Sequence, residues 1–233
     1  MRKFIELLLL LMVLATQLSG EGLLYPPPKL VVFDRWVLDV DHLKLMSVED
    51  TVNPNIVWDV NQEPRLWDQP ELGMDGVNFP VYYEDGSLLG NLMTEPVMPE
   101  SHTITGSQIS LKVQPDDQIL WTYNPDPPLF YGKYLKVILD GSNLYIAIYH
   151  PISTGSGLVC LDAKTGEEIW RGEGVQLMIG HSQYMNEVYI NLIDDKIVMV
   201  GDEAGGSYIQ VFDAQTGERQ FYNLDYQWEQ NGY

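Results

Sequence analysis

Two short acidic stretches carry the first residues whose types and spacing could do chemistry. Asp162-Ala163-Lys164-Thr165-Gly166 and Asp213-Ala214-Gln215-Thr216-Gly217 share the order Asp, Thr, Gly, and an aromatic residue, Trp170 or Phe221, follows four residues after each glycine. A carboxylate beside a hydroxyl could hold a cation or local backbone amides, and glycine tolerates positive φ. Because the order recurs, we interpret these stretches as parts of a repeat and not as one catalytic site.

Other polar stretches lack the spacing of a known chemical site. Asp194-Asp195 and Asp202-Glu203 could bind Ca²⁺, but the EF-hand spacing is absent and solvated turns are the simpler interpretation. The run Gly201 to Ser207 lacks the lysine of a phosphate loop and predicts a hairpin. The histidines are scattered, with no zinc-ligand spacing: His42, His102, His150 and His181. No Gly-x-Ser-x-Gly elbow of a serine hydrolase is found.

The charge balance excludes one large class of partners. The 233 residues hold 13 Lys and Arg against 33 Asp and Glu, a net charge of -20. Nucleic-acid binding needs a positive field for the phosphates, so no nucleic-acid partner is expected. Anionic membrane surfaces are disfavoured as well. The acidity fits either the solubility of an exported protein or a cation site or basic partner.

The single cysteine predicts no intramolecular disulfide. Cys160 lies in an apolar strand-like run, where a small buried hydrophobe is the expected role. A reactive thiol is the alternative, although no neighbouring residue suggests a lowered pKa.

The N-terminus predicts export. Met1-Arg2-Lys3 is positively charged, residues 7–14 are apolar, and residues 15–20 are small or polar. This order is typical of a secretory signal peptide over residues 1–20. No later segment is long and apolar enough to span a bilayer, so the mature chain is expected in the periplasm or secreted.

Residues 21–100 predict an irregular, β-rich region, which could be a divergent repeat. Short strands are expected at residues 30–33, 36–41 and 43–48. Asp85-Gly86-Ser87, between apolar residues 81–83 and 88–89, predicts a hairpin. The prolines spread through residues 51–99 argue against helices.

Residues 101–233 show a regular period. Strands are expected at residues 108–113, 118–121, 134–139, 144–149, 187–192 and 196–200. The aromatic residues Trp121, Trp170 and Phe221 are 170 − 121 = 49 and 221 − 170 = 51 residues apart. About four short strands in about 50 residues is the size of a propeller blade.

The repeat resembles the PQQ-like (quinoprotein-type) β-propeller repeat, whose motif runs Ala-x-Asp-x-x-Thr-Gly-x-x-x-Trp. One copy has Cys160 at the Ala position and matches at Asp162, Thr165, Gly166 and Trp170. The next copy has Val211 at the Ala position and Phe221 at the Trp position, and matches at Asp213, Thr216 and Gly217. The copy ending at Trp121 is degenerate, with Val113 at the Asp position and Asp116-Asp117 at Thr-Gly. The resemblance covers residues 109–221.

The resemblance implies an all-β fold of four-stranded antiparallel blades, in a complete, incomplete or open propeller. It implies that the motif residues are structural: Asp and Thr hold turn amides, Gly supplies a left-handed residue, and the aromatic packs on the neighbouring blade. After the signal peptide, 233 − 20 = 213 residues leave room for about four blades. Three architectures are consistent with this length: a piece of a larger propeller, an open array completed by a partner, and a small closed propeller.

The predicted function is a non-enzymatic binding or scaffold module for a protein or small ligand on the propeller face. The alternative is a fragment or diverged member of the PQQ- and Ca²⁺-dependent quinoprotein dehydrogenases. No cofactor is predicted; PQQ and Ca²⁺ belong only to the alternative. No catalytic, cofactor-binding or metal-ligating residue is assigned, because no motif of that family's active site is recognisable.

Overall fold

The computed structural model describes eleven stretches of the chain, which are residues 30–33, 35–39, 44–47, 55–63, 79–97, 106–116, 118–125, 134–149, 156–172, 185–203 and 206–224. The expected signal peptide and all four histidines lie outside these stretches. Within them, the search for a helix long and apolar enough to cross a membrane finds none.

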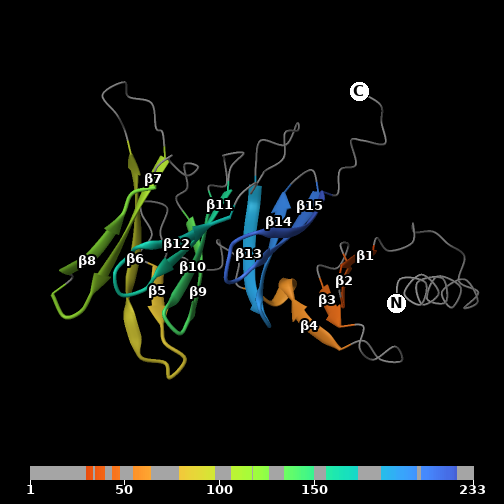
Figure 1. Ribbon diagram of the computed structural model, residues 1–233, viewed down its shortest axis with the longest axis horizontal. Helices are drawn as coiled ribbons and strands as arrows, with labels where there is room; N and C mark the ends of the chain where they lie inside the picture. Colours follow the sequence, from red (N-terminus) through yellow and green to blue (C-terminus); the bar gives the residue numbers. More distant parts are fainter. Residues whose placement is uncertain are drawn as a thin grey trace, which may run out of the picture. The chain divides into compact units, whose positions relative to one another are not determined.

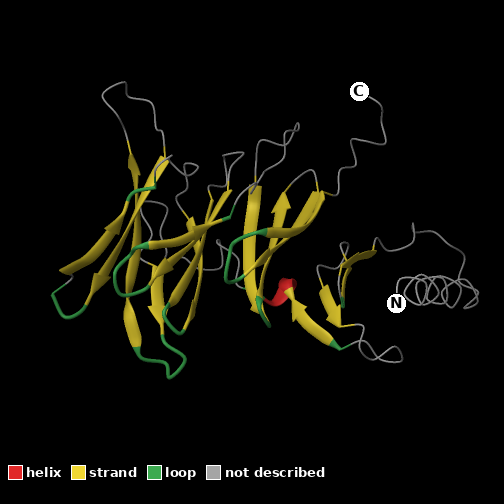
Figure 2. Ribbon diagram, viewed as in Figure 1, coloured by secondary structure: helices red, strands yellow, loops and turns green. Residues whose placement is uncertain are grey.

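The described residues form four antiparallel sheets of four strands each and one short 3₁₀ helix (Figures 1 and 2). In every sheet the strands follow one another in chain order, so each is a simple meander. This confirms the expected all-β fold of propeller-type blades.

We call the sheets blades 1 to 4. Blade 1 contains β1 (Leu30–Phe33), β2 (Trp36–Asp39), β3 (Lys44–Ser47) and β4 (Ile56–Asp59), followed by the 3₁₀ helix η1 (Val60–Gln62). Blade 2 contains β5 (Phe79–Tyr82), β6 (Leu88–Val97), β7 (Gly106–Val113) and β8 (Gln118–Tyr123). Blade 3 contains β9 (Tyr134–Asp140), β10 (Asn143–Tyr149), β11 (Ser156–Asp162) and β12 (Glu168–Arg171). Blade 4 contains β13 (Met185–Ile193), β14 (Lys196–Glu203), β15 (Gly206–Asp213) and β16 (Arg219–Leu224).

The chain divides into two compact units, Met1–Glu63 and Pro64–Tyr233. The boundary that we expected at residue 100 falls between β6 and β7, which pair in one sheet from Asn91↔Lys112 to Val97↔Gly106. The sequence did not show this pairing because β6 contains Pro96 and precedes a long connection. Unit 1 therefore holds blade 1, and unit 2 holds blades 2 to 4.

The core of unit 2 lies between its blades. The central strand β10 is buried on both faces. Its residues Leu144, Ile146 and Ile148 pack into a cluster with blade 2, and the alternate residues Tyr145, Ala147 and Tyr149 pack into a cluster with blade 4. Blade 3 is thus sandwiched, which explains why β10 is apolar at nearly every position instead of alternating. Figure 1 shows the three blades of unit 2 side by side.

The cysteine belongs to this core. Cys160 on β11 is fully buried in the cluster between blades 3 and 4. Burial, with a further contribution from Asp162, raises the pKa of its thiol to about 12. The expectation of a small buried hydrophobe is confirmed.

Candidate functional site

The Asp-x-x-Thr-Gly turn is held by its own side chains. In blade 3, Asp162 Oδ1 accepts hydrogen bonds from the backbone amides of Lys164 (2.9 Å) and Thr165 (2.8 Å) and from Thr165 Oγ1 (3.1 Å). Thr165 Oγ1 in turn accepts from the Glu167 amide at 3.2 Å. These hydrogen bonds, the Thr165 amide first, lower the pKa of Asp162. One carboxylate oxygen of Asp162 is therefore engaged by the turn, which gives the residue a structural role.

The glycine of the turn receives the indole of the preceding blade. Gly166 has φ +72°, and a Cβ placed there would lie 2.5 Å from Cδ2 of Trp121. Trp121 Nε1 donates a hydrogen bond to the Ala163 carbonyl at 3.0 Å. Glycine is thus required twice, once by the backbone conformation and once by the close approach of the ring.

The same contact recurs between blades 3 and 4. Gly217 has φ +73°, with a built Cβ 2.5 Å from Trp170 Cε3, and Trp170 Nε1 donates to the Ala214 carbonyl at 2.9 Å. Asp213 and Thr216 repeat the turn's hydrogen bonds. Burial acts to raise the pKa of Asp213, but the hydrogen bonds from Thr216 and Gln215 and the charge of Lys196 together lower it.

Phe221 and the degenerate copy that ends at Trp121 complete the set of motif residues. Phe221 on β16 is paired with Val211, as Trp170 is with Cys160. In the degenerate copy, the peptide bond Gln114-Pro115 is cis. Sequence reasoning missed Ala163 and Ala214, whose carbonyls accept the indole hydrogen bonds. Their signal was visible, because alanine follows the motif aspartate in both copies.

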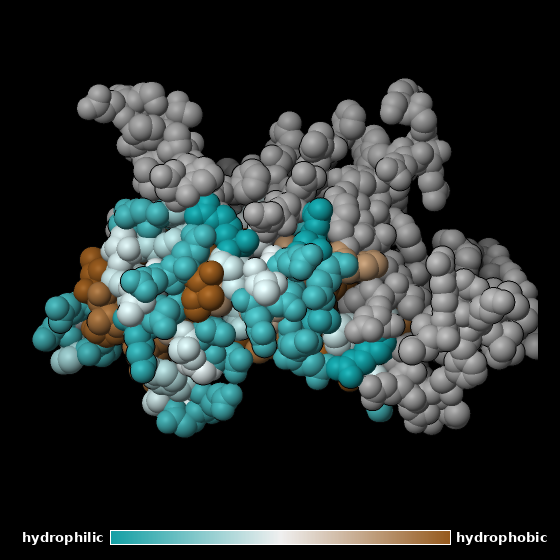
Figure 3. Space-filling model, in the orientation of Figure 1, coloured by the Kyte–Doolittle hydropathy of each residue, from teal (hydrophilic) through white to brown (hydrophobic). Residues whose placement is uncertain are grey.

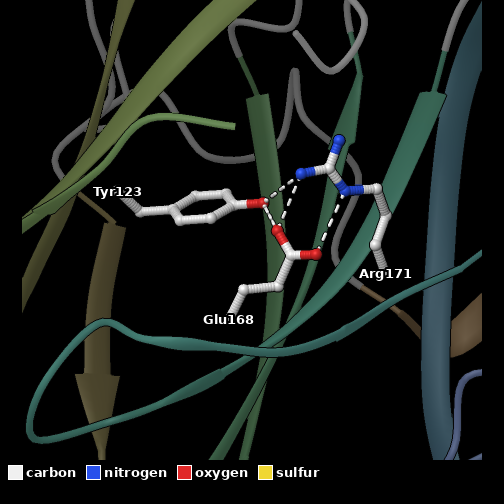
Figure 4. Close-up of polar contacts among 3 residues, drawn as sticks. All are labelled: Tyr123, Glu168 and Arg171. Carbon is white, nitrogen blue, oxygen red and sulfur yellow. Dashed lines mark hydrogen bonds and ion pairs between the residues drawn. The ribbon is translucent and has the colours of Figure 1, made fainter. Parts of the chain in front are cut away.

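A polar cluster joins the outer strands of blades 2 and 3 (Figure 4). Tyr123 on β8 donates its hydroxyl hydrogen bond to Glu168 on β12. Arg171 forms a bidentate pair with Glu168, Nη2 to Oε2 at 2.7 Å and Nε to Oε1 at 3.3 Å, and Nη2 also donates to the Tyr123 hydroxyl at 3.2 Å. Burial, then the Glu168 carboxylate, raises the pKa of Tyr123. The three groups satisfy one another, so the cluster reinforces the blade contact.

A second polar cluster is buried between blades 3 and 4. Glu187 on β13 is fully buried and accepts a hydrogen bond from the Tyr149 hydroxyl at 2.7 Å. Lys136 Nζ lies 3.9 Å from the same carboxylate oxygen and 5.2 Å from the ring centroid of Tyr189. Burial, then Glu187, raises the pKa of Tyr149. The partners compensate a carboxylate that would otherwise be costly to bury.

An open groove lies between two hairpin turns of neighbouring blades. Figure 1 shows these two turns at the lower edge of unit 2. Its volume is about 600 Å³. One wall is the β5–β6 turn, with Tyr83, Glu84, Asp85 and Ser87; the other is the β9–β10 turn, with Leu139, Asp140 and Gly141. The expected hairpin at Asp85-Gly86-Ser87 is confirmed, with Gly86 at φ +80°.

The groove combines an aromatic ring with carboxylates. Tyr83 is 39% exposed although it is a large aromatic residue. Asp85 Oδ1 accepts hydrogen bonds from the Ser87 hydroxyl (2.5 Å) and amide (2.9 Å), which lower the pKa of Asp85. Asp140 stands on the opposite wall. No basic side chain is among the groove's described lining residues.

Figure 3 shows a largely hydrophilic face, with hydrophobic side chains gathered at the end formed by β8. That strand carries two exposed aliphatic residues, Ile119 and Leu120. Across the stretches that the structure describes, no three His, Cys, Asp or Glu side chains come close enough to hold a metal ion.

These features define a protein of propeller-type blades joined by tryptophan–glycine contacts. No family model matches the chain, and no curated protein matches it. Solved structures that are similar include a candidate exo-beta-1,3-galactanase from Bifidobacterium bifidum s17 (14% identity, 88% of this chain, 72% of that chain, TM-score 0.37). Two others are exo-beta-1,3-galactanases. The one from Phanerochaete chrysosporium is 8% identical, over 88% of this chain and 50% of that chain, with a TM-score of 0.35. The one from Clostridium thermocellum is 12% identical, over 88% of this chain and 49% of that chain, with a TM-score of 0.36.

The expected function is corrected by these neighbours. We expected a non-enzymatic binding or scaffold module, whereas the similar solved structures are described as glycan-cleaving enzymes. The sequence analysis did not point to these proteins, to which the chain is 8 to 14% identical. Likeness at these TM-scores carries no substrate or catalytic residue to this chain, so those must be argued from its own groove.

Proposed function

We propose that the protein hydrolyses glycans and that the groove between the β5–β6 and β9–β10 turns is its sugar site. The observation that supports the proposal is the pairing of an exposed tyrosine ring with carboxylates on facing turns of two blades. An aromatic face offers an apolar surface to a sugar ring, and most glycosidases use two carboxyl groups that flank the scissile bond.

The two walls suit different roles. The hydrogen bonds from Ser87 lower the pKa of Asp85, so its carboxylate stays ionised and can stabilise positive charge on the sugar ring. Asp140, on the opposite wall, is the second carboxyl group of the proposed pair. Tyr83 would bind the sugar and take no part in proton transfer.

The test is hydrolysis of a panel of purified glycans by the full chain, with released reducing ends measured by chromatography. β-1,3-Galactan belongs in the panel because the similar structures are described as galactanases. We expect cleavage of at least one glycan, loss of at least 100-fold in kcat in Asp140→Asn, and a raised KM in Tyr83→Ala.

The matched control is Glu167→Gln, an exposed acidic turn residue of blade 3 outside the groove, which should keep full activity. Circular dichroism should show that all variants are folded. Absence of cleavage across the panel, or full activity in Asp140→Asn, would contradict the proposal.

We also propose that the two motif copies are PQQ-like repeats, which the identical tryptophan–glycine contacts in both copies support. Export through a signal peptide, a periplasmic or secreted location and the absence of a cofactor stay predictions. Binding of PQQ and Ca²⁺, which only the dehydrogenase alternative implied, also stays untested.

A further inference from the structure

Blade 1 repeats the strand register of the other three blades. In blades 2, 3 and 4 an aromatic of the fourth strand faces the third strand at Leu111↔Trp121, Cys160↔Trp170 and Val211↔Phe221. The next pair in each skips one residue of the fourth strand: Lys112↔Ile119, Leu161↔Glu168 and Phe212↔Arg219. In blade 1, Leu45↔Trp58 is followed by Met46↔Ile56, with the same skip.

The closing hydrogen bond of the turn also corresponds. Asp162 N donates to Glu167 O, and Asp213 N donates to Glu218 O, both at 2.9 Å. In blade 1, Ser47 N donates to Asn55 O at 2.9 Å, and Ser47 follows Met46 as Asp162 follows Leu161. The turn is longer, 55 − 47 = 8 positions against 167 − 162 = 5, and it lacks the Asp-x-x-Thr-Gly motif. These changes hide the copy from a sequence comparison.

The indole of Trp58 donates its hydrogen bond to a different kind of acceptor from those of Trp121 and Trp170. Trp121 and Trp170 donate to carbonyls 42 and 44 residues further along, in the following blade. Trp58 Nε1 donates instead to Glu63 Oε1 at 2.8 Å, five residues away. Glu63 directly follows η1, and its amide donates to the Val60 carbonyl at 3.1 Å. Trp58 and Val60 are both buried, at 5% and 1% exposure.

We infer that blade 1 is a fourth, diverged copy of the repeat, capped from within by η1 and Glu63. Glu63, directly after the 3₁₀ helix, supplies the acceptor that the following blade supplies in blades 2 and 3. Atypical repeats that close their own exposed side are a known device of repeat proteins. The inference is independent of the glycan proposal, because it uses no residue of the groove.

The test is hydrogen exchange by mass spectrometry on the full chain. Glu63→Ala removes the acceptor, and Trp58→Phe removes the donor while keeping a ring. Each should raise amide exchange in residues 44–63 about tenfold, and the peptides of β7–β8, β11–β12 and β15–β16 should stay unchanged. Glu63→Gln keeps an acceptor oxygen and should resemble the wild type.

Trp170→Phe is the reciprocal control, because its partner lies in another blade. It should raise exchange in both residues 156–172 and residues 206–224. The inference is overturned if Glu63→Ala leaves residues 44–63 unchanged, or if it raises exchange in blades 2 to 4 as much as in blade 1.

Discussion

At the scale of single residues, the structure separates two requirements for glycine that the motif combines. Gly166 has positive φ and no room for a Cβ, whereas Gly86 has positive φ with nothing within 4 Å of a built Cβ. A substitution of Gly86 by alanine therefore measures the cost of the backbone conformation alone. A substitution of Gly166 by alanine measures that cost together with the cost of displacing the Trp121 ring.

We predict that Gly166→Ala lowers the free energy of unfolding more than Gly86→Ala does. The conformational cost is about 1 to 2 kcal/mol at either position. Displacing the Trp121 ring should add about 1 to 3 kcal/mol at Gly166. Urea unfolding of both variants measures the difference. Equal losses would show that the ring moves aside without cost and that the glycine serves the turn alone.

At the scale of the elements, the β11–β12 and β15–β16 turns depend on ionised carboxylates. The pKa values of Asp162 and Asp213 are lowered in the folded state. A lowered folded-state pKa adds stability that is present above the unfolded pKa of about 3.9 and is lost as the pH falls through the folded value. The turns should therefore weaken below pH about 4.

We predict that Asp162→Asn is less stable than the wild type at pH 7 and that the gap narrows as the pH falls from about 4 toward 2. The amide can still accept the turn's hydrogen bonds but carries no charge to lose. Urea unfolding at a series of pH values measures the gap. At 0.15 M NaCl, where exposed charges are screened, Glu167→Gln at a neighbouring exposed site is the control and should track the wild type. A constant gap across the series would rule out the carboxylate's titration as the cause.

At the scale of the whole molecule, charge opposes compactness. A net charge of -20 on 233 residues places the folded chain under self-repulsion. Salt shortens the range of that repulsion, since the Debye length falls from about 30 Å at 0.01 M to about 8 Å at 0.15 M.

We predict that the Tm rises as NaCl is increased from 0.01 to 0.15 M, as measured by calorimetry. The variant Glu167→Gln/Glu218→Gln, which removes two exposed charges, should melt higher than the wild type at low salt and should respond less to NaCl. A Tm that falls with salt would show that the ion pairs of the blades outweigh the repulsion.

Much of this architecture could be read from local patterns. Strand alternation, the Asp-x-x-Thr-Gly turns and the spacing of Trp121, Trp170 and Phe221 predicted four-stranded blades, because turn chemistry and period-2 burial depend on residues close in the chain. The role of Cys160 followed from its apolar neighbours for the same reason. For blade 1 the sequence predicted three of the four strands and a possible divergent repeat. The fourth strand and the match in register were not predicted, because the turn is longer and lacks the motif.

Contacts between blades depended on the folded chain. The carbonyl partners of Trp121 and Trp170, the cluster of Tyr123 with Glu168 and Arg171, and the buried Glu187 join residues 38 to 48 positions apart. The groove likewise joins the turn at Tyr83 to the turn at Asp140. Which hairpin turns meet is set by how the sheets stack, and stacking depends on the shape of buried surfaces, to which distant residues contribute jointly. Local sequence specified the blades, and the packing of whole sheets brought the tyrosine and the carboxylates together.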